Sequence, residues 1–214
     1  GSHLNLIRVH GGRPDRESPP PRGKPLRASP YAPCRDKRLT PLLGTSTSAL
    51  GQAERLSLGY SSEVATVLSR DGQVLARQIL SESGGSLSAE VLGAMRGNTF
   101  THNHPRGGSF SPDDVMTALA YQPSEFRAVT STRSLSLSFD KPPADLLGIE
   151  NAANIELFMA SEQKAIGASF RQAVANGRLL PPTEQAMRDV FKSNYFMQQL
   201  SSRNSWIRYE VAPR

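Results

Sequence analysis

The segment Glu63–Ile79 constrains the fold more than any other part of the chain. Its sequence, EVATVLSRDGQVLARQI, alternates apolar and polar residues on both sides of Asp71-Gly72. A period of two is typical of a strand with one buried face, and an Asp-Gly pair tolerates the positive φ angles of a type I′ turn. The sequence therefore predicts a β-hairpin, closed by a type I′ turn, near the start of the folded part.

The other predicted elements are mainly strands in the first half of the domain and mainly helices in the second. We expect helices over 88–95, 111–121, 151–176 and 183–202, and strands over 98–101, 125–130, 134–139 and 206–211. The predicted helix over 111–121 starts with Ser111 as its N-cap, followed by Pro112 and two carboxylates, as helix starts favour. This order of elements is typical of an α+β domain.

The first 50 residues differ from the rest in composition. We interpret Gly1–His3 as residues left by an expression vector. From Gly11 to Leu43 the chain is rich in Pro, Arg, Ser and Gly and has few apolar residues, so it cannot bury enough surface to offset its conformational entropy. We therefore predict a disordered basic tail over 1–50 and one folded domain over 51–214.

The excess positive charge lies in the predicted tail. Between Leu4 and Leu50 there are nine Lys or Arg and three acidic residues, whereas the remainder has 16 of each sign. Nucleic-acid binders usually carry their positive charge on the folded surface, so we expect no nucleic-acid partner. The single cysteine, Cys34, excludes an internal disulfide, and no apolar run is long enough to span a membrane.

The loop Thr101–Asp114, THNHPRGGSFSPDD, is the strongest signal for chemistry. His102 and His104 are one residue apart at the end of a strand, so both project to the same side and Asn103 projects to the other. Two imidazoles placed in this way can converge on one metal ion, one phosphate or one carbonyl. The glycines that follow Pro105 allow the backbone to turn sharply.

One resemblance of this loop is to the JAMM metalloproteases. Their pattern is HxH, seven residues and then SxxD, which implies a zinc ion held by two His and an Asp and a water activated by an upstream Glu. The matching residues are His102, His104 and Asp114, with Glu63 as the base. The gap from His104 to Ser111 is one residue shorter here, and a shorter gap moves Asp114 away from the metal unless the loop compensates.

A second resemblance matches the spacing without a gap. The pattern HNHPxGxSFSPxD, followed by Glu-x-Arg-Ala-Val, resembles the ADP-ribosyltransferase-like (ART-like) domains associated with phage head-morphogenesis proteins and with Xanthomonas type III effectors. This resemblance implies a single ART-like α+β domain, with a split, mainly antiparallel sheet and C-terminal helices. It also implies NAD as the cofactor and no metal ligands.

The ART-like resemblance assigns roles to eight residues. The implied catalytic residues are His102, His104 and Glu125, and the implied NAD-binding residues are His102, Asn103, Ser109, Phe110, Ser111 and Arg127. The family's Glu-x-Glu motif is Glu125-Phe126-Arg127 here, and a guanidinium cannot stabilise the cation that develops on the ribose. Glu210 in the last predicted strand is an alternative source of the acid.

Three functions therefore stand as hypotheses. The first is a mono-ADP-ribosyltransferase-like secreted effector that is delivered into a target cell and modifies a host or competitor protein. In one form of it the NAD site is degenerate and binds a peptide, and the segment Lys24–Arg38 of the tail could dock there. The second is a JAMM-like zinc isopeptidase. The third is a non-catalytic interaction module in which the HNHP loop is only a turn.

Overall fold

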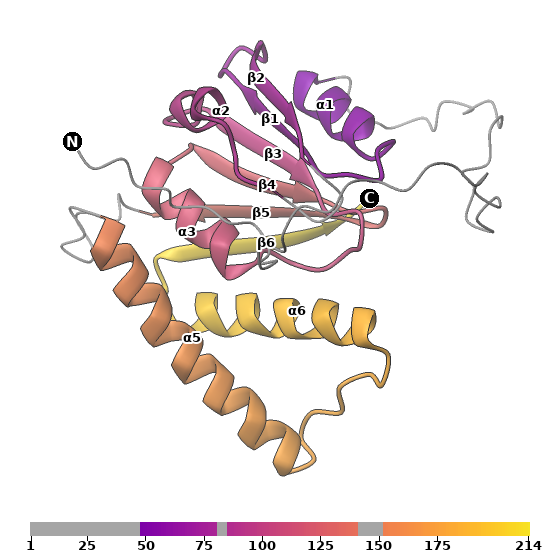
Figure 1. Ribbon diagram of the computed structural model, residues 1–214, viewed down its shortest axis with the longest axis vertical. Helices are drawn as coiled ribbons and strands as arrows, with labels where there is room; N and C mark the ends of the chain where they lie inside the picture. The colour runs from indigo at the N-terminus through magenta and orange to yellow at the C-terminus, as the bar shows by residue number, and fades with distance from the viewer. Residues whose placement is uncertain (1–47, 81–84, 141–151) are drawn as a thin grey trace, which may run out of the picture.

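The computed structural model describes residues 48–80, 85–140 and 152–214, which form five helices and six strands (Figure 1). The helices are α1 Ala49–Ser57, α2 Ala89–Ala94, α3 Pro112–Tyr121, α5 Ala152–Ala175 and α6 Gln185–Arg203. The strands are β1 Val64–Leu68, β2 Val74–Ile79, β3 Thr99–Asn103, β4 Glu125–Val129, β5 Arg133–Phe139 and β6 Ile207–Pro213. The predicted tail, including the segment proposed to dock, lies outside the described residues up to position 47.

All six strands belong to one mixed sheet in the order β2-β1-β3-β4-β5-β6. Four of the five pairings are antiparallel, and only β3 and β4 are parallel, with α3 as the crossover between them. The predicted α+β class and the mainly antiparallel pairing are confirmed. The expected split of the sheet is wrong, because the return through α3 pairs β4 with the whole of β3 and leaves no break at the centre.

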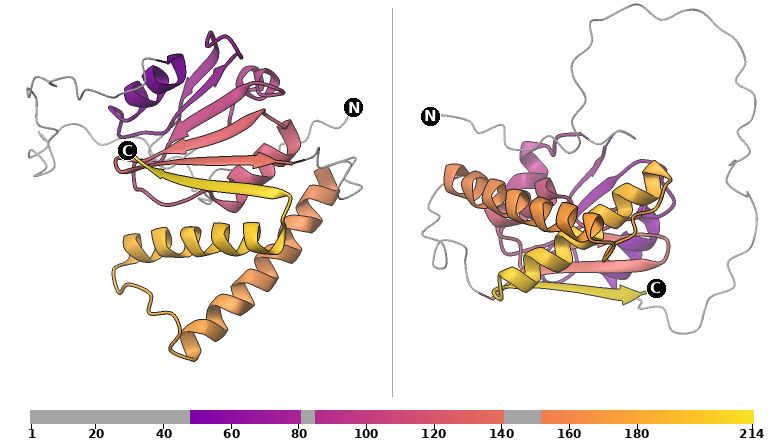
Figure 2. Two further views of the ribbon diagram at one scale, coloured as in Figure 1. Left: turned by 180° about the vertical axis from the view of Figure 1, so that it is seen from behind. Right: turned by 90° about the horizontal axis from the view of Figure 1, so that it is seen from below.

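The two faces of the sheet are covered differently. The main core lies on one face, where side chains of the central strands pack against α2, α3, α5 and α6. Helix α1 covers part of the other face beside β1, and α5 and α6 form a V beyond β6 (Figures 1 and 2). Because β1 lies between α1 and the core, all five of its residues are buried, and the expected alternation is absent from this strand.

The hairpin of β1 and β2 is confirmed, but its turn is not type I′. Gly72 has a φ of +87°, whereas Asp71 does not have a positive φ. The N–H of Ser69 donates to the carbonyl of Gln73 at 2.9 Å, and the N–H of Gly72 donates to the carbonyl of Ser69 at 3.0 Å. These bonds define a three-residue loop whose last residue is left-handed, so a single glycine closes the hairpin.

The helices and strands agree with the predicted ranges to within a few residues, except for one additional helix and one longer strand. Helix α1 was not predicted; Ser48 caps it, with its hydroxyl accepting from the N–H of Gly51 at 3.1 Å. Strand β3 continues two residues beyond its predicted end, so His102 and Asn103 lie within the sheet. Among the described helices, none has the length and apolar character needed to cross a membrane.

Candidate functional site

The site forms where the end of β3 meets the start of α3. Strand β3 turns His102 toward the main core, and His104 follows on the same side just after the strand ends. In the first turn of α3, Asp114 and Ser111 form a capping box. The Asp114 N–H donates to Ser111 Oγ at 3.1 Å, and Asp114 Oδ2 accepts from the Ser111 N–H at 2.7 Å and from its hydroxyl at 2.8 Å. The cap fixes the carboxylate beside the two imidazoles.

Three potential ligand residues converge at this point. His102 Nε2 lies 2.8 Å from His104 Nε2 and 3.5 Å from Asp114 Oδ1, and His104 Nε2 lies 3.7 Å from Asp114 Oδ2. Zinc binds nitrogen and oxygen ligands at about 2.0–2.2 Å, so the edges of its coordination tetrahedron are about 3.3–3.6 Å. The separation between His102 and Asp114 lies in that range and the one between His104 and Asp114 lies just above it, whereas the two Nε2 atoms are closer, at the distance of a hydrogen bond. The resemblance to ART-like domains implies no metal ligands. His102, His104 and Asp114 nevertheless lie close enough to one another to hold a metal ion.

Burial and charge shift the protonation of this group. Burial alone would lower the pKa of His102, but the hydrogen bond and charge of Asp114, together with the charge of Glu63 and the backbone of Arg127, raise it above 6.5. Burial alone would raise the pKa of Asp114, but the hydrogen bond from His102 and the charges of both imidazoles hold it well below 3.8. The carboxylate is therefore ionised, and His102 takes up a proton more readily than a free imidazole.

The loop from His104 to Ser111 is one residue shorter than in the JAMM pattern, and its backbone conformation compensates for this. Gly107 and Gly108 both have positive φ, at +74° and +100°, and the N–H of Gly107 donates to the carbonyl of His104 at 2.9 Å. Such angles are strained for other residues. The two glycines let six residues span the distance from His104 to Ser111, and Asp114 reaches the histidines without a longer connection.

Glu63 lies beside the histidines from the neighbouring strand. In the antiparallel ladder of β1 and β3, Ala65 pairs with His102, so the same register places Glu63 opposite His104 and on the same face. Its charge acts on His102, and it lines a small cavity together with His102 and Asp114. The upstream glutamate nominated from sequence is therefore brought to the site.

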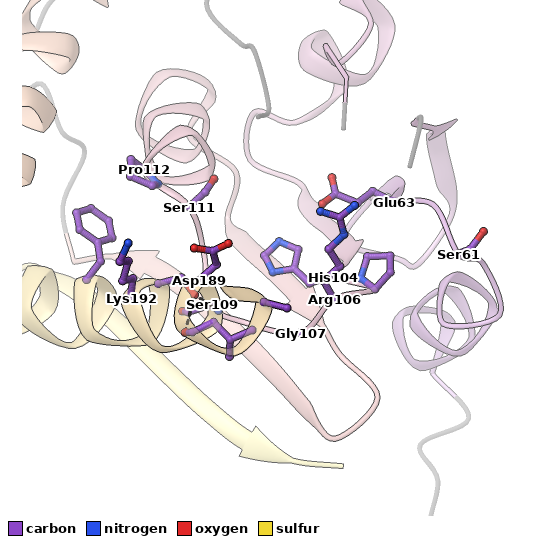
Figure 3. A pocket seen from close by; sticks show the side chains of 15 residues that line it. Ser61, Glu63, His104, Arg106, Gly107, Ser109, Ser111, Pro112, Asp189 and Lys192 are labelled. Atoms are coloured by element: carbon purple, nitrogen blue, oxygen red, sulfur yellow. Dashed lines mark hydrogen bonds between the residues drawn. The ribbon is translucent and has the colours of Figure 1, made fainter. Parts of the chain in front are cut away.

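A cleft of about 650 Å³ opens from this cluster to the surface (Figure 3). Glu63, His104 and Arg106 line one side of it, and Asp189, Lys192 and Ser193 of α6 line the other. The volume lies within the range of cavities that take small molecules or short peptides. The α6 wall was missed from sequence, where the apolar stripe of this helix indicates only core packing.

The remaining residues of the loop have structural partners. Asn103 Oδ1 accepts from the N–H of Val64 at 2.6 Å, and its Nδ2 donates to the carbonyl of Ser62 at 3.0 Å. Phe110 is fully buried against Phe126. Ser109 donates its hydroxyl to Tyr209 at 2.8 Å. Every polar group of these predicted NAD contacts is thus used by the fold, as is Ser111 in the helix cap.

Glu125 and Arg127 lie on the face of the sheet opposite His102. Their neighbours in β4, Phe126 and Ala128, face the histidine and the core. Arg127 instead binds Glu54 of α1 and Glu125, each at 2.7 Å. The register of β5 and β6 places Glu210 on the same face as these residues. The structure does not bring the predicted catalytic acid, or its alternative, to the histidines.

Comparison of the chain with protein-family models, with curated proteins and with solved structures gives no match. The chemistry of the site is therefore inferred from the geometry of its residues.

Proposed function

We propose that this domain is a metal-dependent hydrolase of the JAMM type, which cleaves an amide or isopeptide bond. The observation that carries the proposal is the convergence of His102, His104 and Asp114 to separations of 2.8, 3.5 and 3.7 Å. Two imidazoles and one carboxylate are a ligand set that catalytic zinc sites use, and three protein ligands leave a fourth position for water or substrate.

The surroundings of the three ligands fit such an ion. His102 and Asp114 are buried, and His104 borders the cleft, so the fourth position would face the space that a substrate enters. The capping box holds the carboxylate from behind, which is the outer-shell support that ligands need. A bound zinc ion would supply a Lewis acid that polarises the scissile carbonyl and lowers the pKa of water.

Glu63 is placed to move the proton. It is in register with His104 and on the same face, at the edge of the cleft. In the proposed reaction Glu63 takes a proton from the attacking water as the new C–O bond forms. It then returns that proton to the leaving nitrogen as the C–N bond breaks, so that an acid and an amine are released.

The ADP-ribosyltransferase-like function remains a prediction with less support from the geometry. It requires a carboxylate and a histidine in one NAD site, and Glu125 and His102 lie on opposite faces of the sheet. The degenerate, peptide-binding form and the pure interaction module also remain predictions.

Zinc titration of the metal-free protein by calorimetry tests the proposal. We expect one zinc ion per chain in the wild type and a large loss of affinity in His104→Ala and Asp114→Asn. Asp113→Asn is the matched control, because it changes the adjacent carboxylate in the same helical turn, which is not one of the three proposed ligands. A wild type that folds normally and binds no zinc would contradict the proposal.

A further inference from the structure

The loop between the metal-ligand positions is attached to the C-terminal part of the domain. The N–H of Ser109 donates to Ser193 Oγ of α6 at 3.0 Å, and the Ser109 hydroxyl donates to the Tyr209 hydroxyl of β6 at 2.8 Å. One residue of the loop is therefore held from two elements that lie 84 and 100 residues away in the chain. The hydroxyl of Ser193 also donates to the carbonyl of Val190 at 3.0 Å, and this bond orients its oxygen to accept from the Ser109 N–H.

Helix α6 approaches the loop closely at Gly108. A Cβ atom on this glycine would lie 3.0 Å from Ser193 Oγ and 3.7 Å from Val190, and the residue itself is buried. The loop thus has no room to shift toward α6. Tyr209 closes the other side, because its ring contacts the buried ring of Phe110 at a centroid distance of 6.2 Å.

We infer that α6 and β6 clamp residues 107–110 in the conformation that brings Asp114 to the histidines, with Ser193 and Tyr209 as positioning residues. The inference rests on the proposed function where it concerns metal affinity. The clamp itself is a statement about the loop and holds for the metal-free protein too.

The physical reason lies in the composition of the loop. It contains two adjacent glycines, and glycine loses more conformational freedom on ordering than any other residue. A loop left free would have to be ordered each time a metal bound, and that entropy would be subtracted from the binding free energy. Hydrogen bonds formed in advance from Ser193 and Tyr209 remove this cost, so the three ligands are preorganised.

The test compares Ser193→Ala and Tyr209→Phe with two matched controls in α6. Ser201→Ala removes a hydroxyl that donates to Gln198 on the same helix, and Tyr195→Phe removes a hydroxyl bonded to Ser169. Both of these hydroxyls have their partners outside the loop. For each protein we would measure the zinc dissociation constant by calorimetry and the exchange rate of the Ser109 amide in the metal-free state.

We expect the zinc dissociation constant to rise about three- to tenfold in each clamp variant, which is the effect of losing one hydrogen bond, and to stay unchanged in the controls. The Ser109 amide should exchange faster by a similar factor in Ser193→Ala. If the wild type binds zinc, clamp variants with zinc affinities equal to those of the controls would overturn the inference. If Ser193→Ala does not fold, Tyr209→Phe decides the question, because it keeps the ring that packs on Phe110.

The two proposals fail in different ways. A wild type that binds no zinc defeats the proposed function, and the Ser109 amide then still reports on the clamp. A wild type that binds zinc with an affinity insensitive to both clamp variants defeats the inference and leaves the proposed function intact.

Discussion

The Nε2 atoms of His102 and His104 lie 2.8 Å apart, and Asp114 offers one carboxylate oxygen to each of them. Two neutral imidazoles can share this contact only if one donates a proton to the other, and the neighbouring carboxylate of Asp114 raises the pKa of His102. The contact between the two imidazoles therefore uses the nitrogens that would hold the proposed metal ion, and a proton and that ion would compete for them.

This competition predicts a pH dependence of opposite sign for the metal-free and zinc-loaded proteins. The pKa of His102 is raised in the fold, so its contribution to stability is complete below 6.5 and is lost as the pH rises through the folded value. The pKa of Asp114 is lowered, so its contribution is present above 3.8 and is lost as the pH falls through the folded value. The metal-free protein should thus lose stability as the pH rises above 6.5 and through the raised pKa of His102, whereas zinc binding would strengthen over the same range because the ligands deprotonate.

Thermal unfolding with chelator and with added zinc, across the same pH range, measures both trends. The difference between the two unfolding temperatures should widen as the pH rises. A metal-free protein that becomes more stable over this range would show that Asp114 does not raise the pKa of His102.

Glu63→Gln should separate metal binding from chemistry. The amide keeps the shape of the side chain but cannot accept the proton of the attacking water, so we expect zinc affinity within about threefold of wild type and a loss of turnover of at least about a hundredfold. Hydrolysis of a panel of fluorogenic peptide amides and lysine isopeptides provides the measurement. Equal activity in the two proteins would exclude Glu63 as the base.

The ion pairs beneath α1 should matter for stability and not for the site. Glu54 is buried and holds Arg127 at 2.7 Å, with Arg214 at 3.4 Å. Glu54→Ala leaves Arg127 with Glu125 alone, and we expect a loss of about 2 kcal/mol in the free energy of unfolding. Denaturant unfolding measures this loss, and zinc affinity serves as the control because it should not change.

NAD binding tests the ADP-ribosyltransferase-like prediction directly. Because Glu125 and His102 lie on opposite faces of the sheet, one ligand cannot contact both side chains. We therefore expect that, if calorimetry detects saturable NAD binding at all, Glu125→Ala and His102→Ala will not both abolish it. Binding that both variants remove would restore that prediction and require the sheet to open.

The local patterns of the sequence predicted most of the fold but only part of the site. Period and capping signals are local, so the hairpin at Gly72 and the cap at Ser111 could be predicted from neighbouring residues. The face of the sheet on which Glu125 lies depends on how β4 pairs with β3. That parallel pairing places Ala128, and not Glu125 or Arg127, beside His102, and no local pattern in the sequence predicts it. The partners of Ser109 lie even farther away along the chain, and no local pattern marks Ser193 or Tyr209 as contacts of the loop.

The side chain of Asn103 bridges two peptide groups on either side of Glu63, the carbonyl of Ser62 and the N–H of Val64. Three consecutive residues therefore act as one unit, in which the outer two present the proposed nitrogen ligands and the middle one sets the distance from them to Glu63, the proposed base. An aspartate at position 103 could accept from Val64 but could not donate to Ser62, so an isosteric change would release one side of the base. If only the two histidines were introduced into another sheet, their distance to the glutamate would not be reproduced. Asn103 and the segment Ser62–Val64 would have to be introduced with them.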